Sequence, residues 1–391
     1  MKRIGTAERR ARLGARHHLA RPAGSSDEAA AGMVGLHSSD PVSPFLSARA
    51  RVDGFIPGDL EAALYERRSL VRMLGMRRTL FVVPPDLAAV MHEACTKALV
   101  PRERARLVRR LEEQGIVKAG RGARWVDRVT AKTLDAIDAR GEAGARELTA
   151  DVPELAGKLS FGEGTRWVGT VGLSTRVLFL LATEGRIVRA RPVGGWTSSR
   201  YRWARTEAWL GAPLPGLDHA EACAELLRRW LRTFGPGTVT DIRWWTGWSA
   251  RTARATLEDL EAVEVDLDVG TGYVLPDDLE AESAAEPWIA LLPGLDPTAM
   301  GWKERTWYVG EHEAGLFDTG NAGPTIVANG RVIGSWTQRA DGEIAVGYVG
   351  RVDRRTRDAI EAERARLRAW VGDVRFGARF PTPLERRLAS G

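Results

Sequence analysis

Residues 70–83, Leu70-Val71-Arg72-Met73-Leu74-Gly75-Met76-Arg77-Arg78-Thr79-Leu80-Phe81-Val82-Val83, contain two short apolar runs separated by a turn-sized gap. Short apolar runs bounded by turn residues are typical of two strands paired in a hairpin. The gap holds Gly75, Arg77 and Arg78, and a helical stretch at 58–67 precedes the first run. This order predicts a winged-helix unit whose wing carries two arginines.

The residues upstream of the hairpin predict further helices. Residues 6–18 form a basic helical stretch, and Asp27 to Leu36 is a second helix capped by Ser26. Pro41 can open a third helix at its first turn, because the fixed φ of proline suits that position. The order helix, helix, hairpin is thus complete within residues 1–100, the first predicted domain.

The same order of elements recurs twice along the chain. In the second predicted domain, 101–210, a helix pair at 151–160 and 165–182 precedes strands at 186–193 and 200–203 around a Gly194-Gly195 turn. In the third, 211–283, helices at 220–232, 240–245 and 250–260 precede strands at 263–269 and 272–275. The spacing is irregular, so these units are tandem domains and not a short-period solenoid.

From about Ala284 the pattern changes to short strands separated by turns. Strands are predicted at 288–292, 306–309, 325–328, 331–336 and 343–349, followed by a charged helix from Asp353 to Val371. Asn329-Gly330 and Asp341-Gly342 are strong hairpin signals. We predict that residues 284–391 form a small β-barrel or sandwich closed by the helix. The predicted fold class is therefore α+β, mainly helical.

Composition and charge limit the possible partners. The 391 residues are 44% hydrophobic and 28% charged, which is typical of a soluble globular protein, and the formal net charge is +6. Basic residues gather in 1–21, which has one acid, and in 186–205, which has six arginines and no acid. Two such clusters suit a polyanion, although a charge run is also typical of a solvated face.

Other features exclude several classes of protein. Cys95 and Cys223 lie far apart with no metal-ligand spacing, so we expect buried reduced thiols, no metal and no cofactor. The first residues lack the apolar core of a signal peptide, and no stretch approaches the roughly 18–20 apolar residues of a membrane span. We therefore expect a cytoplasmic protein that does not bind membranes.

Several motifs, in order along the whole chain, make it similar to one known family. Residues 35–51, 76–80, 241–247, 291–296, 321–325 and 330–336 resemble the AlkZ-like family of bacterial DNA glycosylases. The resemblance implies three winged helices in a C shape plus a C-terminal β-barrel. It also implies removal of bulky N7-alkylated purines, including antibiotic adducts and crosslinks, by hydrolysis of the N-glycosidic bond.

The chemistry that the resemblance implies needs few residues. Alkylation at N7 puts a positive charge on the base, so the leaving group needs no general acid. The enzyme must stabilise an oxocarbenium-like sugar and deliver a water to it. The motif holds no lysine, which argues against a Schiff-base lyase step and favours a monofunctional enzyme.

The polar run Gly35-Leu36-His37-Ser38-Ser39-Asp40-Pro41 departs from the family's motif at two positions. The family has Gln, one residue, then Gln or Asp, where this chain has His37 and Ser39. A serine hydroxyl is a poor base, so Asp40 would supply the missing carboxylate. Our hypothesis is that His37 and Ser39 position the water while Asp40 assists or orients His37. The alternative for Asp40 is a helix cap.

The resemblance also identifies candidate DNA-binding residues. In the family the first hairpin meets DNA near the lesion, which points to Arg77, Arg78 and Thr79. Arg49 and Arg51 follow the motif on a predicted helix and are expected to reach phosphate. Many relatives have His where this chain has Phe81, which we expect to be a core residue.

Two functions from different classes follow from the sequence. The first is a monofunctional glycosylase that acts on bulky cationic N7-alkylguanine or other purine adducts, in repair or in self-resistance to a DNA-alkylating natural product. The second is a non-catalytic winged-helix DNA-binding or regulatory protein. Both predict double-stranded DNA as partner, and the protein is expected to be a monomer.

Overall fold

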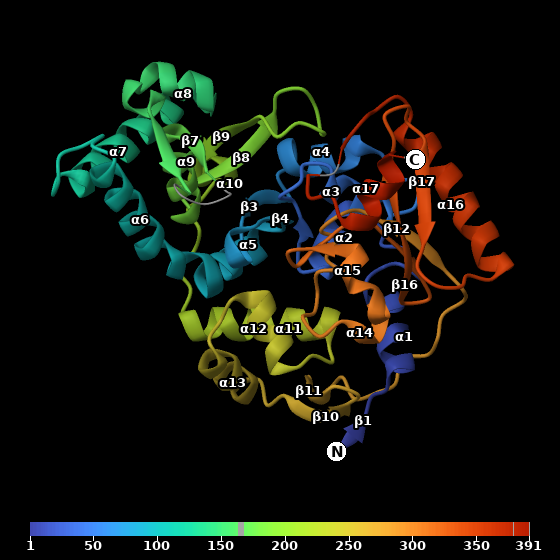
Figure 1. The fold of residues 1–391 in the computed structure, drawn as a ribbon. Helices are drawn as coiled ribbons and strands as arrows, with labels where there is room; N and C mark the ends of the chain where they lie inside the picture. Colours follow the sequence, from blue (N-terminus) through green and yellow to red (C-terminus); the bar gives the residue numbers. More distant parts are fainter. Residues whose placement is uncertain (163–167, 378, 391) are drawn as a thin grey trace.

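The computed structural model describes residues 1–162, 168–377 and 379–390. Its fold is α+β with helices predominating, as predicted, and four groups of elements follow one another along the chain (Figure 1). Each of the first three groups contains a three-stranded sheet, and the fourth contains a four-stranded sheet.

The first group is built on an antiparallel sheet of order β2-β4-β3. The predicted hairpin is confirmed, because Val71 of β3 pairs with Val83 of β4, and every residue of both strands is buried. Its elements are α2 (Ser26–Gly32), β2 (Leu36–His37), α3 (Ser43–Arg49), α4 (Pro57–Tyr65), β3 (Val71–Leu74), β4 (Leu80–Val83) and α5 (Pro85–Met91). The helix α2 ends at Gly32, earlier than predicted, because the next residues lead into strand β2.

The second group contains a hairpin that the sequence analysis did not predict. Its elements are α6 (Val100–Glu113), α7 (Gly122–Arg140), β5 (Glu142–Gly144), α8 (Ala145–Asp151), β6 (Lys158–Phe161), β7 (Gly169–Gly172), α9 (Leu173–Thr183), β8 (Ile187–Pro192), β9 (Tyr201–Arg205) and α10 (Thr206–Leu210). The predicted helix pair 151–160 and 165–182 is wrong where β6 and β7 stand, and residues 165–167 lie outside the described residues. Residues 157–172 hold five glycines, each costing a helix about 1 kcal/mol relative to alanine.

The third group has the predicted order of helices and hairpin. Its elements are α11 (His219–Phe234), α12 (Val239–Thr246), α13 (Ala250–Asp259), β10 (Val263–Leu267) and β11 (Gly270–Val274). The N-terminal strand β1 (Lys2–Arg3) pairs in parallel with β10 and completes this sheet. The start of the chain therefore packs on residues more than 250 positions away.

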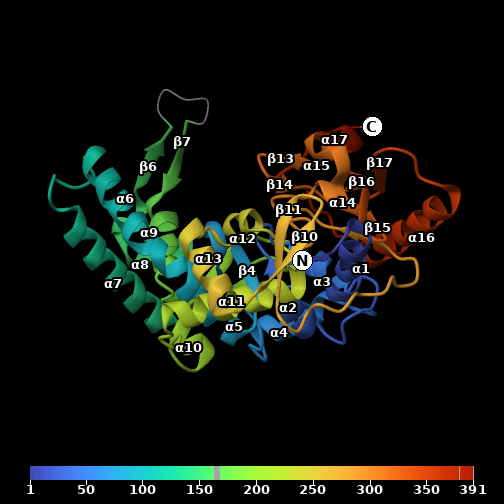
Figure 2. The same cartoon turned by 90° about the horizontal axis from the view of Figure 1, so that it is seen from below.

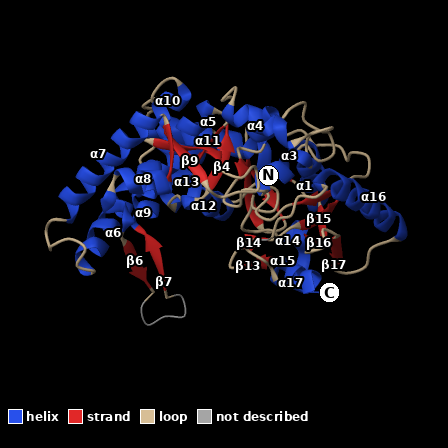
Figure 3. Cartoon of the chain, turned by 90° about the horizontal axis from the view of Figure 1, so that it is seen from above, coloured by secondary structure: helices blue, strands red, loops and turns tan. Residues whose placement is uncertain are grey.

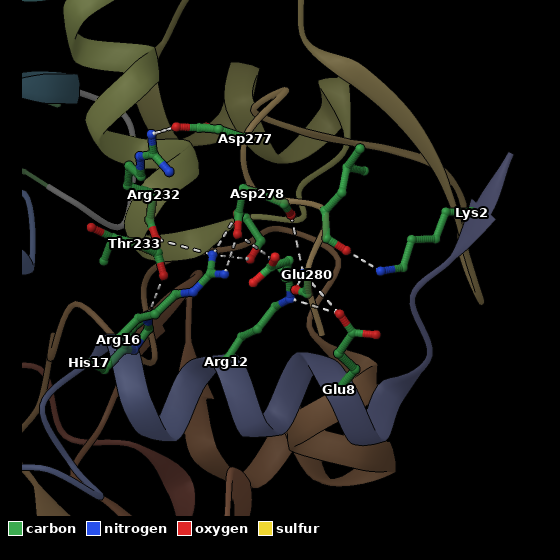
Figure 4. Close-up of polar contacts among 12 residues, drawn as sticks. Lys2, Glu8, Arg12, Arg16, His17, Arg232, Thr233, Asp277, Asp278 and Glu280 are labelled. Carbon is green, nitrogen blue, oxygen red and sulfur yellow. Dashed lines mark hydrogen bonds and ion pairs between the residues drawn. The ribbon is translucent and has the colours of Figure 1, made fainter. Parts of the chain in front are cut away.

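Helix α1 (Thr6–Arg16) turns part of the basic N-terminal run toward the protein and buries Arg9 and Arg12. Arg12 and Arg16 both form ion pairs with Asp278, at 3.0 and 2.6 Å, as Figure 4 shows. Arg9 is buried over the ring of Trp307 at 4.1 Å. The run 1–21 is thus neither a polyanion-binding face nor a solvated one at these positions, because its guanidiniums join α1 to the third and fourth groups.

The fourth group contains an open sheet instead of the expected closed barrel. The strands follow the antiparallel order β12-β15-β16-β17, so β12 and β17 are its two edges. Helix α16 packs against β12, and α17 packs against β16 and β17. The elements are β12 (Ile289–Leu292), α14 (Thr306–Val309), α15 (Glu313–Leu316), β13 (Phe317–Asp318), β14 (Asn321–Ala322), β15 (Thr325–Ala328), β16 (Arg331–Gln338), β17 (Ile344–Tyr348), α16 (Arg354–Val371) and α17 (Pro383–Ser390). The strand predicted at 306–309 is the short helix α14, whose Trp307 and Tyr308 pack against Trp302.

The four groups together give the molecule an arched outline. The β6–β7 hairpin of the second group and the C-terminal sheet project to the same side of the central helices (Figures 2 and 3). Among the described residues, no helix combines the length and apolar character needed to cross a bilayer. The same residues contain no cluster of three or more histidine, cysteine, aspartate or glutamate side chains arranged to hold a metal ion.

Candidate active site and nucleic-acid interface

The predicted motif and the predicted wing are parts of one sheet. His37 of β2 pairs with Phe81 of β4, and the Ser38 N–H donates to the Leu80 carbonyl at 2.7 Å. Gly35 starts this strand with φ +101°, and a Cβ there would lie 2.7 Å from the Val83 side chain. The backbone of the wing therefore fixes where the motif side chains lie.

The His37 ring is buried beneath the motif and is uncharged. It meets the Phe81 ring edge to face at 5.1 Å, and its Nδ1 accepts a weak hydrogen bond from the Ser39 N–H at 3.4 Å. Burial, followed by the positive charge of Arg77, lowers the pKa of His37 to about 3. Because Nδ1 is an acceptor, the proton sits on Nε2. Nε2 has no bond within the described residues and is not among their fully buried unpartnered atoms, so it keeps contact with solvent.

Ser39 lines a large cleft, whereas Asp40 lines a smaller pocket next to it. The Ser39 hydroxyl accepts the Leu80 N–H at 3.2 Å, which leaves its O–H free to donate. One Asp40 oxygen accepts the Val42 N–H at 3.1 Å just before α3, as a turn-forming aspartate does. Burial raises the pKa of Asp40. The structure thus brings His37 and Ser39 together and gives Asp40 a role in the turn.

The wing arginines are held in an unusual backbone conformation. Arg77 and Arg78 have φ values of +52° and +66°, a left-handed region that costs a non-glycine residue of order 1–3 kcal/mol. Arg77 stacks on Trp244 at 4.1 Å, and Arg78 forms an ion pair with Glu103 at 3.3 Å. The Thr79 hydroxyl donates to the Met76 carbonyl at 2.7 Å and closes the turn. Both arginines remain exposed.

The expectation that Arg49 and Arg51 reach phosphate is corrected by the structure. Arg51 is fully buried, and its guanidinium donates two hydrogen bonds of 2.7 and 2.8 Å to the Asp296 carboxylate. Arg49 forms a mostly buried ion pair with Glu363 of α16. Helix α3 faces the fourth group, so these side chains join two parts of the protein.

The cleft that Ser39 lines has a volume of about 760 Å³ and lies between the wing and the second group. Its described lining includes one glutamate, Glu147, and six arginines: Arg78, Arg146, Arg189, Arg200, Arg202 and Arg379. Aromatic rings interleave with these charges, since Arg189 lies 4.8 Å over Trp203. An arginine-rich surface with aromatic faces is typical of nucleic-acid binding.

Some of these residues carried a sequence signal and others did not. Arg189, Arg200 and Arg202 belong to the run 186–205, whose hairpin β8–β9 forms one wall of the cleft. Arg379 lies far along the chain, yet its guanidinium donates to the Ser39 carbonyl at 2.8 Å. Arg146 and Arg379 stand in no arginine run, so only the folded structure reveals them.

Replacing His37 with glutamine should change how stability depends on pH. The unfolded histidine has a pKa near 6.5, whereas the folded one has a pKa of about 3. Below pH 6.5 His37 therefore binds a proton in the unfolded chain but not in the native protein. As a result, the free energy of unfolding falls by about 1.4 kcal/mol per pH unit. We expect His37→Gln to lose less stability than wild type between pH 6 and 4, as measured by urea unfolding at each pH. Equal losses would contradict the buried neutral ring.

Comparison with known proteins gives a consistent result. The structure is similar to the Streptomyces sahachiroi DNA glycosylase AlkZ, with a TM-score of 0.72 and 22% sequence identity over 95% of this chain and 97% of that one. The comparison with curated proteins gave no match. The family model "DNA glycosylase AlkZ-like" matches residues 30–370. The chain therefore belongs to the AlkZ-like family of DNA glycosylases and is a DNA N-glycosylase.

Proposed function

We propose that the protein is a monofunctional glycosylase that hydrolyses the N-glycosidic bond of bulky, cationic N7-alkylpurines in duplex DNA. The observation that carries this proposal is the arginine-lined cleft of about 760 Å³ with Ser39 on its wall, whose N–H donates to the His37 Nδ1. A cleft of this size accommodates a bulky adduct, since ligand pockets range from about 300 to 1,000 Å³. The activity would serve repair or self-resistance to a DNA-alkylating natural product.

The proposed mechanism depends on His37 and Ser39 as hydrogen-bonding partners of one water. The water accepts one hydrogen bond from the His37 Nε2–H and donates one to the Ser39 Oγ, so that its second lone pair faces the sugar. When the new C–O bond has formed, the excess proton of the former water passes to solvent. The alkylated base leaves as a neutral molecule and needs no proton from the enzyme. The low pKa of His37 matters here, because a neutral ring does not repel the positive charge that develops on the sugar. Asp40 contributes by holding the turn that carries Ser39.

The proposed DNA interface combines the wing and the arginine hairpin. We interpret the three helix-and-hairpin groups as winged helices, with boundaries near residues 1–100, 101–210 and 211–283 before the C-terminal region 284–391. In this proposal Arg77 and Arg78, which are exposed, enter a groove of the duplex, and the arginines of β8–β9 that line the cleft contact phosphates. Because such contacts release counterions, binding should weaken steeply with salt.

A panel of modified duplexes tests the proposed function. Duplexes carrying N7-methylguanine, a bulky N7-guanine adduct or no damage are incubated with the protein and then treated with alkali. We expect strand cleavage at the bulky adduct, slower cleavage at N7-methylguanine and none in the undamaged duplex. Salt-dependent binding of all three duplexes without alkali-labile sites would instead favour the non-catalytic DNA-binding alternative.

A further inference from the structure

A second group of arginines lies beside the cleft, on helices α6 and α9. It consists of Arg106 and Arg110 of α6 and Arg176 of α9, and we call it the α6–α9 arginine cluster. These side chains surround a small hollow whose walls include Leu107, Leu159 and Leu180. An apolar floor beneath several guanidiniums strengthens their field, because less water screens them.

The described residues do not pair the positive charge of this cluster with carboxylates of its own. Glu103 is the carboxylate that lines the hollow, and it already forms an ion pair with Arg78. Within the described part of the chain, no carboxylate lies at ion-pair distance from the guanidiniums of Arg106, Arg110 or Arg176. An anion would therefore relieve repulsion among like charges.

One hydrogen-bond donor of Arg176 also lacks a partner. Its Nε is buried and has no hydrogen-bond partner, although a guanidinium N–H is a strong donor. Burial, and then the charges of Arg110, Arg106 and Arg78, lower the pKa of Arg176. Buried donors in native proteins are nearly always satisfied, so this Nε leaves room for an acceptor supplied by a water or a ligand.

The cluster is continuous with the proposed DNA cleft. Phe179 lines both the hollow and the cleft, and Arg78 lies 4.9 Å over the Phe179 ring while lining the cleft. The hollow has a volume of only about 20 Å³, too small to enclose a free nucleotide. An anion would therefore contact the guanidiniums at the rim of the hollow, as a phosphate group carried on a strand that already occupies the cleft can do.

We propose that the α6–α9 arginine cluster binds one backbone phosphate of the duplex, next to the cleft where Phe179 lines both. This inference rests on the proposed function, because it takes DNA as the occupant of the cleft. It extends the interface onto α6 and α9, helices that none of the sequence motifs indicated. The contact is with phosphate, so it adds affinity and fixes the register of the strand but reads no base.

The test compares a double variant, Arg110→Gln with Arg176→Gln, with wild type on an undamaged duplex. Loss of one phosphate contact should make the negative slope of the log of the DNA-binding constant against log salt shallower by about 0.9. Binding should weaken equally for different sequences. The matched control is Arg109→Gln on the same helix, whose side chain is 67% exposed and pairs with Glu113. The control should keep the wild-type slope. The melting temperature of the double variant should equal or exceed that of wild type, because like charges are removed.

Single neutral methylphosphonates, moved along the duplex, locate the contact. At one position the substitution should weaken binding by wild type and have no further effect on the double variant. If wild type shows no salt-dependent binding, the proposed function fails. If wild type binds and the double variant keeps its slope, the cluster is not a phosphate site and the inference alone fails. Binding of inorganic phosphate that the double variant loses, with DNA binding unchanged between the two proteins, would overturn the assignment to a strand.

Discussion

Replacing His37 with alanine should slow excision of a bulky N7-alkylguanine by about 100-fold, the lower end of the effect of a positioned polar group in catalysis. The expected loss follows from removal of the Nε2–H, the solvent-contacting donor of the buried ring. Without it the water keeps one hydrogen-bonding partner, Ser39, and its orientation is no longer fixed. The rate of base release under single-turnover conditions measures the step without interference from product release.

Two other substitutions at the same position separate the donor from the packing of the ring. His37→Gln keeps an N–H donor and should retain most of the activity. His37→Phe keeps an aromatic ring against Phe81, whose centroid lies 5.1 Å away, but has no donor and should match the alanine variant. Full activity in His37→Phe would remove the histidine from the mechanism, whatever the alanine variant does.

The sequence indicated where the candidate site lies but only part of its composition. The motif 35–41 and the hairpin 70–83 are both short-range patterns, and their pairing follows from one small sheet. Arg379 could not be found in this way, because it reaches Ser39 from the far end of the chain. Contacts between residues so distant in sequence leave no local periodicity.

The charge of a side chain proved a poor guide to its exposure. From the sequence we expected Arg51, like Arg49, to face solvent on a helix, yet Arg51 has no exposed surface. Arg12 and Arg16 read as part of a basic arm but meet Asp278, an acid from a distant segment. In each case the buried carboxylate that pairs with the arginine lies more than 240 residues away, so the sequence alone favoured DNA as the partner.

The elements that were predicted correctly are those in which local pattern and packing agree. The helices and hairpin of the third group have clear caps, such as Thr238 and Ser249, and apolar faces that match their period. The β6–β7 hairpin was missed because its glycines obscure the alternation of a strand. Short helix α14 was read as a strand because aromatic residues favour strands until tertiary contacts override that preference.

Replacing Asp296 with asparagine should lower the free energy of unfolding by about 3–5 kcal/mol, the cost of leaving one member of a buried ion pair uncompensated. The carboxylate accepts from the Arg51 guanidinium, the Ser47 hydroxyl and the Thr298 N–H, and Asp296 has no exposed surface. Burial by itself would raise the pKa of Asp296, but the charge and hydrogen bonds of Arg51 outweigh it and the pKa is lowered. Urea unfolding at pH 7 measures the loss, and a loss below about 1 kcal/mol would contradict a dry, uncompensated site.

The double variant Arg51→Met with Asp296→Leu tests whether stability and activity require the charges of this pair or only well-packed side chains at the two positions. Well-packed apolar replacements of a buried ion pair are often neutral or stabilising, so this variant should recover most of the stability that Asp296→Asn loses. The pair joins α3 to the segment after β12, and the Ser43 hydroxyl donates to the Gly294 carbonyl at 2.7 Å beside it. Recovery of excision together with stability would show that Arg51 acts by holding α3, and the Ser39 turn before it, in place. Recovery of stability without excision would instead show that the Ser39 turn depends on the ion pair itself and not only on a packed contact.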